Sequence, residues 1–177
     1  MKRSRIYIHG ILAAVFVASF SVLYFVNSVT SGQITYKYDF IDRSPFLSDF
    51  WPPERFDSVI PTIGGVVRPV VETPVTFFVH PTRAFKSARV QIVFKFANEA
   101  QLALFYQSGE GSDDYTPFEI ERVEAMENGF WKASAIVNMQ DWHKNAQGRY
   151  SVKIDSPLLL EQGNTLWVKN LSVTLSD

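Results

Sequence analysis

Polar and hydrophobic residues alternate with a period of two along much of the chain after residue 32. In QITYKYDF, the apolar side chains occupy every second position from Ile34 to Phe40. The segments ARVQIVFKFA and GRYSVKIDSP repeat this alternation. A strand with one buried face has such a pattern, because successive side chains point to opposite sides of the sheet. These three segments are therefore predicted to be β-strands.

Five further segments have the length and composition of strands: VTFFVH, QLALFYQ, FEIERVEA, GFWKASAIVN and NTLWVKNLSVTLS. The last keeps apolar residues on both phases, which predicts a β-bulge near Lys169 or Asn170. No segment after Val29 has a sustained apolar repeat of 3.6 residues. About eight to nine short strands within residues 33–177 predict an all-β, antiparallel β-sandwich.

The N-terminal pattern is different, because Ile6 to Val26 contains no Asp, Glu, Lys or Arg. As a helix this run spans roughly 30 Å, the thickness of the hydrocarbon core of a bilayer. Lys2, Arg3 and Arg5 precede it, which places the N-terminus in the cytoplasm. The prediction divides the chain into a basic cytoplasmic tail (1–5), a transmembrane signal anchor (6–27), a linker (28–32) and an extracytoplasmic domain (33–177). A cleaved signal peptide is the alternative, although the apolar run is longer than its usual hydrophobic region.

Gly10, Ala14 and Ala18 recur every four residues in this run and share one face of the predicted helix. Small residues at that spacing allow two membrane helices to approach closely. The alternative is that Gly and Ala are simply common in membrane helices. The lipid bilayer is the expected partner of this segment under either interpretation.

Composition narrows the possible functions. Fifteen Phe, seven Tyr and four Trp supply more apolar surface than a disordered chain carries. The absence of cysteine excludes a disulfide framework, a cysteine-ligated metal and a thiol nucleophile. Beyond residue 32 the chain has 14 Lys and Arg against 18 Asp and Glu, without a basic stripe. This balance argues against a nucleic-acid partner.

The stretch SPFLSDFWPPERF, residues 44–56 and hereafter the strap, holds four aromatics and three prolines. Prolines exclude a helix interior and a central strand, and they stiffen the backbone. The four aromatics are Phe46, Phe50, Trp51 and Phe56. Either they plug one end of the sandwich, or they dock against a partner subunit or the membrane surface, because four exposed rings form an unusually large apolar patch.

Glycan binding is the favoured chemistry for the outer domain. Sugars stack on flat, exposed aromatic rings beside polar side chains that bond their hydroxyls. The candidate rings are Trp131, Trp142, Trp167 and Tyr115. The alternative, which is favoured for each tryptophan taken singly, is core or half-buried packing. The candidate polar neighbours are Gln107, Asp113, Asp114 and Asn145.

The segment EIERVE offers the only candidate catalytic pair, Glu119 and Glu124. It resembles the E-x-D-x-x-E strand of concanavalin-like retaining glycoside hydrolases, in which two acids flank the scissile bond. Glu121 stands where that family has Asp, which moves the middle carboxylate by one methylene. The alternative is an exposed strand face whose charges discourage edge pairing.

No histidine or acid spacing predicts a metal site. A calcium ion held by Asp39, Asp42 or Asp155 remains an alternative, since calcium binds several oxygens, but no loop has the spacing of a calcium loop. No cofactor is expected.

The segments YKYDF, GRYSVKIDSPLL and LWVKNLSVTL resemble the first and last strands of jelly-roll domains, as in carbohydrate-binding modules and galactose-binding-like sandwiches. The resemblance implies a jelly-roll sandwich that binds glycans through aromatic platforms, often with a structural calcium.

The leading interpretation is a non-catalytic, membrane-anchored protein whose sandwich is extracytoplasmic, in the periplasm or at the cell surface, and which binds glycans or is structural in the cell envelope. The first alternative is an accessory subunit of a membrane complex that docks through the anchor and the strap. The second is a small retaining glycosidase using Glu119 and Glu124.

Overall fold

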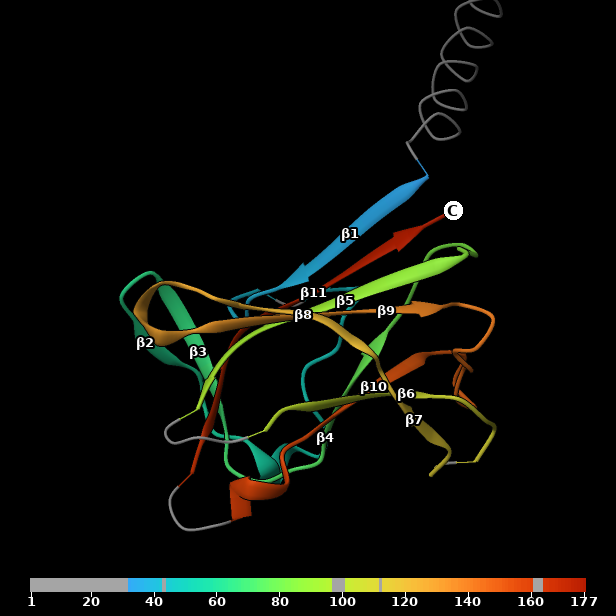
Figure 1. Cartoon of the computed structure of the whole chain (residues 1–177). Helices are drawn as coiled ribbons and strands as arrows, with labels where there is room; N and C mark the ends of the chain where they lie inside the picture. Colours follow the sequence, from blue (N-terminus) through green and yellow to red (C-terminus); the bar gives the residue numbers. More distant parts are fainter. Residues whose placement is uncertain (1–31, 43, 97–100, 112, 161–163) are drawn as a thin grey trace, which may run out of the picture. The chain divides into compact units, whose positions relative to one another are not determined.

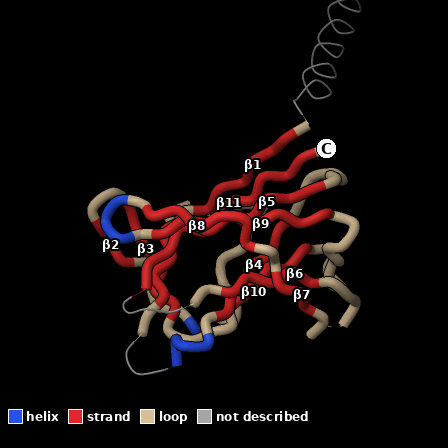
Figure 2. The backbone as a smooth tube through the Cα atoms, viewed as in Figure 1, coloured by secondary structure: helices blue, strands red, loops and turns tan. Residues whose placement is uncertain are grey.

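The computed structural model describes residues 32–42, 44–96, 101–111, 113–160 and 164–177. This part of the chain forms eleven strands in two sheets, together with three short 3-10 helices (Figures 1 and 2). The prediction of an all-β, antiparallel sandwich is confirmed. The predicted anchor, with Gly10, Ala14 and Ala18, lies outside the described residues. None of the helices that the structure does describe is long and apolar enough to cross a membrane.

The larger sheet has seven strands. Its order is β2 (Ile60–Thr62), β3 (Gly65–Val70), β11 (Leu166–Ser176), β5 (Ser87–Phe96), β9 (Trp131–Asn138) and β8 (Ile120–Ala125), with β1 (Gln33–Tyr38) also pairing with β11. The smaller sheet has the order β4 (Val75–Val79), β10 (Tyr150–Asp155), β6 (Ala103–Gln107) and β7 (Tyr115–Pro117). The 3-10 helices span Pro53–Arg55, Glu127–Gly129 and Pro157–Leu160. Figure 1 shows the two sheets as layers, with β4, β10, β6 and β7 forming the lower one.

Alternation along the strands decides which side chains enter the core between the sheets. On β4, Val75, Phe77 and Val79 are fully buried, and on β10 Val152 and Ile154 meet them from the neighbouring strand. The residues between them, such as Thr76 and Lys153, face outward. Each strand thus presents one face to the core and one face to the outside, as its period of two predicts.

The predicted bulge in β11 is confirmed. The register with β5 shifts between Val168 and Asn170, so Lys169 is the extra residue. Before the bulge, Leu166 and Val168 are buried, whereas after it the buried residues are Leu171, Val173 and Leu175. One extra residue therefore keeps apolar side chains on the core face although the sequence changes phase.

The sequence interpretation missed β2, β3 and β7, and it expected no strand between Phe40 and Val66, where β2 lies. Two of these strands have only three residues, and prolines interrupt the pattern of β2 and β3. Pro61 lies in the edge strand β2, and Pro69 lies beyond the segment of β3 that pairs with β2. At both positions the missing N–H removes little from the ladder, so the structure tolerates prolines that argue against a strand in the sequence.

The strap connects the two sheets along one side of the sandwich. Leu47 and Trp51 form bridges to Val79 and Thr76 of β4, and Phe56 forms a bridge to Val70 of β3. The backbone N–H of Trp51 donates to the Thr76 carbonyl at 2.8 Å, and the N–H of Thr76 donates back at 2.8 Å. The strap thus extends the smaller sheet beyond β4 before it crosses to the larger sheet.

Three of the four strap aromatics pack against the core. Phe50 is buried, and Phe46 and Phe56 lie half-buried against the same cluster. Phe46 stacks on Tyr36 of β1 with ring centroids 4.5 Å apart. These three rings therefore act as the plug that one interpretation of the strap expects. Trp51 is the exception, because it remains 60% exposed.

Candidate functional site

The four aromatics predicted to form a glycan platform do not share a surface. Trp142 is only 2% exposed, and its ring packs against Phe118 and Tyr150 at centroid distances of 6.0 and 5.1 Å. Its Nε1 donates to the Ser151 carbonyl at 3.1 Å. The prediction that Trp142 belongs to an exposed platform is therefore wrong, because both the ring and its polar atom already have partners inside the protein.

Trp167 lies on the outer face of the larger sheet and is half-buried. In register it pairs with Lys95 of β5, whose ammonium lies 6.0 Å from the centroid of the indole ring. The same ammonium donates to the Asn128 carbonyl at 3.3 Å, which ties it to the turn between β8 and β9. Lys95 therefore covers part of the ring that a sugar would need.

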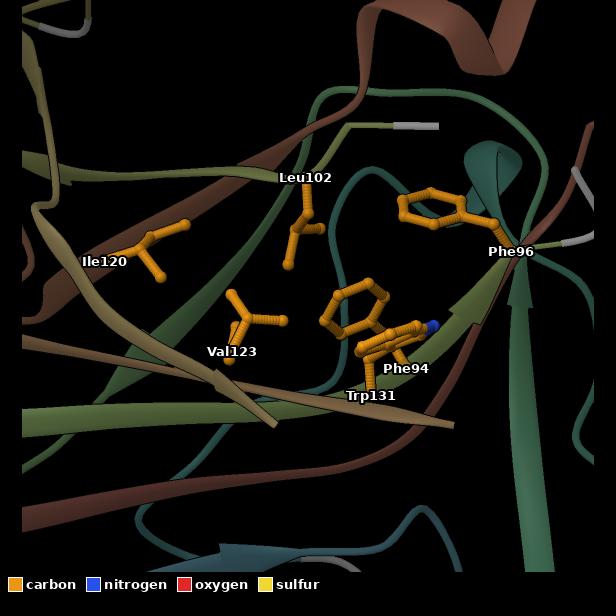
Figure 3. Close-up of a pocket in the computed structure, with 7 residues that line it drawn as sticks. Phe94, Phe96, Leu102, Ile120, Val123 and Trp131 are labelled. Carbon is orange, nitrogen blue, oxygen red and sulfur yellow. The ribbon is translucent and has the colours of Figure 1, made fainter. Parts of the chain in front are cut away.

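Trp131 lines an open groove of about 300 Å³ at the β5–β9–β8 end of the sandwich (Figure 3). Its ring is 44% exposed. The side chains of Phe94, Val123 and Trp131 point toward Leu102 across this groove (Figure 3). All seven lining residues are apolar: Phe94, Phe96, Leu102, Ile120, Val123, Trp131 and Ala133. Apart from the indole N–H of Trp131, no side chain that lines the groove can bond sugar hydroxyls, which are costly to bury unpaired.

Tyr115 belongs to a different surface, the outer face of the smaller sheet. One row of directly paired residues crosses this face from the strap inward. Trp51 is opposite Thr76, Thr76 is opposite Lys153, and Lys153 is opposite Phe105. Directly opposite residues of an antiparallel pair point to the same side of a sheet. Trp51 and Phe105 therefore lie on one face, separated by Thr76 and Lys153.

Tyr115 closes this surface from the β7 edge. Its hydroxyl donates to the Ser151 hydroxyl of β10 at 3.2 Å, so its ring lies across β6 instead of pointing away from the sheet. Ser151 in turn donates to Oε1 of Gln107 at 2.7 Å, and Nε2 of Gln107 donates to the Gly109 carbonyl at 3.1 Å. The buried network holds the Tyr115 ring in place. We call the surface formed by Trp51, Thr76, Phe105, Tyr115 and Lys153 the outer platform.

Two cations lie over aromatic rings on this face. The Lys153 ammonium is 4.3 Å from the Tyr115 centroid and 4.8 Å from the Phe105 centroid. The Arg149 guanidinium lies 5.8 Å from the ring of Phe78, the residue two positions after Thr76 on β4. Within the described part of the chain, no ion pair involves a strand residue of the smaller sheet. These cations are therefore held by rings and not by carboxylates.

His80, which directly follows β4, is affected by partial burial and by the Arg149 charge. Its pKa is lowered from its ordinary value, first because partial burial disfavours the charged imidazolium and second because the Arg149 charge repels it. The neutral imidazole is accordingly the favoured form near neutral pH. The shift is consistent with a positive potential at this end of the smaller sheet.

The candidate catalytic acids lie at the β8 edge of the larger sheet. Glu124 is on β8, and Glu119 directly precedes this strand. Glu124 accepts contacts from Arg122 at 2.7 Å and Lys132 at 3.1 Å. Its pKa is lowered, principally by the hydrogen bond from Lys132. A glycosidase acid needs a raised pKa so that it can donate a proton to the leaving group. The environment of Glu124 instead lowers its pKa. In addition, the register between β8 and β9 shifts between Ile120 and Arg122, so the acids of β8 do not follow the regular spacing of that family's strand.

Among the described residues, no group of three or more His, Asp or Glu side chains is placed to hold a metal ion. Asp39 accepts a hydrogen bond from the backbone N–H of Ile41 at 3.3 Å, and Asp155 lies on β10. Asp39, Asp42 and Asp155 are therefore not brought together as a calcium site.

Sequence reasoning singled out Tyr115 of the outer platform, and Gln107 in the network that holds its ring, but it named Trp51 only as part of the strap and did not name Thr76, Phe105 or Lys153. The alternation of YSVKID did contain a signal, because it placed Lys153 on the polar face of its strand. Trp51 carried no such signal, since it lies in the strap and joins the platform only through its bridge to Thr76.

No family model matches the chain, and no curated protein matches it. Solved structures do. The chain is similar to the CBM22-1 xylan-binding domain from Paenibacillus barcinonensis Xyn10C, with a TM-score of 0.53 and 10% identity over 84% of this chain and 99% of that domain. It is also similar to the xylan-binding module CBM15, with a TM-score of 0.48 and 15% identity over 81% of this chain and 97% of that module. The match to the CBM22-1 domain confirms, at the level of the fold, the expected resemblance to carbohydrate-binding modules.

Proposed function

We propose that this protein is a non-catalytic glycan-binding protein, and that it holds a polysaccharide chain across the outer platform. The observation that carries the proposal is the row of paired residues that runs from Trp51 through Thr76 and Lys153 to Phe105, with the Tyr115 ring next to Lys153. The exposed Trp51 ring offers a flat face to a sugar. The Lys153 ammonium covers part of the Phe105 and Tyr115 rings and, with Thr76, supplies polar atoms for sugar hydroxyls. The fold shared with a xylan-binding domain supports the same class of ligand.

The size of the outer platform favours a chain over a single sugar. Trp51 and Phe105 are three strand positions apart, and neighbouring strands are spaced by about 4.8 Å, so the row extends roughly 14 Å. A surface this long suits contact with several successive sugars of a polymer. It also gives no enclosed site in which a bond would be cleaved.

In this proposal the apolar run Ile6–Val26 anchors the sandwich to a membrane with the platform on the extracytoplasmic side. The run's length and the basic residues before it support that arrangement. Envelope or extracellular polysaccharides are the ligands within reach of such a protein.

The test is affinity electrophoresis of the full-length chain, kept in detergent, through gels that contain single polysaccharides. We expect at least one polymer to retard the native chain, and Trp51→Ala to weaken that retardation about tenfold, equivalent to about 1.4 kcal/mol of binding free energy. Trp131→Ala is the matched control, because it removes the other exposed tryptophan. Retardation lost only in Trp131→Ala would move the site to the groove, and no retardation by any polymer would contradict glycan binding.

A further inference from the structure

We infer that the outer platform selects acidic polysaccharides, and that Lys153 recognises the carboxylate of a uronic acid. The inference rests on the proposed function and adds the chemical class of the ligand. It follows from the central place of Lys153 in the row, between Thr76 on one side and Phe105 on the other.

The surroundings of Lys153 hold its ammonium over the face without giving it an anion. The group lies within 5 Å of two ring centroids, Tyr115 at 4.3 Å and Phe105 at 4.8 Å. Aromatic faces attract a cation, but they do not replace the hydrogen bonds that three N–H donors can make. In the part of the chain that the structure describes, Lys153 has no ion-pair partner. A carboxylate lying on the platform would supply both the charge and the acceptors.

Arg149 adds a second cation on the same side of the sheet. Its guanidinium lies over Phe78, which faces outward because Phe77 and Val79 on either side are buried. Phe78 is opposite Ser151, and Thr76 is opposite Lys153, so the Ser151–Phe78 row lies between Arg149 and Lys153 on this face. Acidic groups repeat along a uronic-acid polymer, and two separated cations match such a repeat better than one.

The acids near this face do not cancel the two cations. Asp155 follows Lys153 by two residues on β10 and therefore faces the same side, but no ion pair joins it to Lys153 or Arg149. Asp114, in the loop before Tyr115, turns its carboxylate to the backbone N–H of Gly111 at 2.9 Å. The cations thus lie over rings, whereas Asp155 lies one row from Lys153 without an ion pair to it, and Asp114 is bound within its own loop.

The test compares matched polymers that differ only in charge. Polygalacturonate and alginate are used intact and after chemical reduction of their carboxylates to primary alcohols. The full-length chain is titrated in detergent at 0.15 M ionic strength, where charges more than about 8 Å apart are largely screened. We expect at least one intact polymer to bind about tenfold more tightly than its reduced form, and Lys153→Gln to abolish that difference.

Lys132→Gln is the matched control, because it also removes one lysine from an outward sheet face but leaves the platform untouched. If both lysine variants lose affinity equally, the attraction is non-specific and the assignment to Lys153 is wrong. If intact and reduced polymers bind equally and Trp51→Ala weakens both, the acidic selectivity is overturned while glycan binding stands. If neither form binds, and if no other polysaccharide retards the chain in the gel experiment, the inference and the proposed function are both overturned.

Discussion

The outer faces of the two sheets satisfy their polar side chains in different ways. On the larger sheet, Gln91 donates to the Ser134 hydroxyl at 3.0 Å and accepts from the Ser172 hydroxyl at 3.3 Å, so one side chain bridges three strands. Beside it, Glu124 contacts both Arg122 and Lys132. On the smaller sheet, the outward cations Lys153 and Arg149 lie over aromatic rings. Lys95 of the larger sheet also lies over a ring, that of Trp167, but its ammonium donates to the Asn128 carbonyl as well.

This difference indicates which face is available to a ligand. A face whose donors and acceptors are paired across strands must break those pairs to bind anything, and each hydrogen bond to a charged group contributes about 1.5–3 kcal/mol. The outer platform presents rings and an ammonium whose hydrogen-bonding capacity is not used by a carboxylate. Both faces belong to strands with the same alternating pattern, so the pattern alone does not distinguish them.

The largest expected effect distinguishes the buried ring of Phe50 from the exposed ring of Trp51, two neighbouring residues of the strap. Phe50→Ala is expected to lower the free energy of unfolding by about 3–5 kcal/mol, because it removes a buried ring from the core. Trp51→Ala is expected to change it by no more than about 0.5 kcal/mol, since that ring is exposed. Urea denaturation of both variants measures the difference. Equal destabilisation would show that Trp51 is also structural and would weaken its assignment to the platform.

The next effect compares the polar networks of the two sheets. Ser151→Ala is expected to cost about 1–3 kcal/mol, because it leaves the buried Gln107 carbonyl without its donor. Ser172→Ala is expected to cost no more than about 0.5 kcal/mol, since Gln91 is only half-buried and can bond water. The measurement is again the midpoint of urea unfolding. A larger loss for Ser172→Ala would contradict the view that the network under Tyr115 is the more constrained one.

The smallest effect is electrostatic and is measured by NMR titration. Arg149→Gln is expected to raise the pKa of His80 toward its ordinary value, because it removes a repelling cation while burial still lowers that pKa. Lys132→Gln is expected to raise the pKa of Glu124, because it removes the hydrogen bond that contributes most to lowering it. An unchanged His80 in Arg149→Gln would show that no effective positive charge acts at that end of the platform.

The same two shifts predict how stability changes with pH. Both groups have folded-state pKa values below their ordinary ones, so the unfolded chain binds protons first as the pH falls. The contribution of His80 is therefore complete above about pH 6.5 and is lost below it, and that of Glu124 is complete above about pH 4.5 and is lost below it. In His80→Gln, the loss of stability near pH 6 is expected to be smaller.

Much of the fold was predictable because strand formation depends on a local pattern. The alternation in β1, β5 and β10, and the phase change at Lys169, identify the buried residues without knowledge of the partners. The short strands β2 and β7 were not predictable, because three residues are too few to show a period. Their stability comes from pairing with β3 and β6, which is a property of the assembled sheet.

The sequence by itself determined the class of fold, the core face of each long strand and the presence of an aromatic, proline-rich strap. Only the tertiary structure decided where the aromatics lie: Trp142 in the core, Trp131 in an apolar groove, and Trp51 in the same row of paired residues as Lys153 and Phe105. A period of two tells which side chains share a face of one strand. It does not tell which strands become neighbours, because pairing between residues as distant as Trp51 and Thr76, or Lys153 and Phe105, is set by how the whole chain packs.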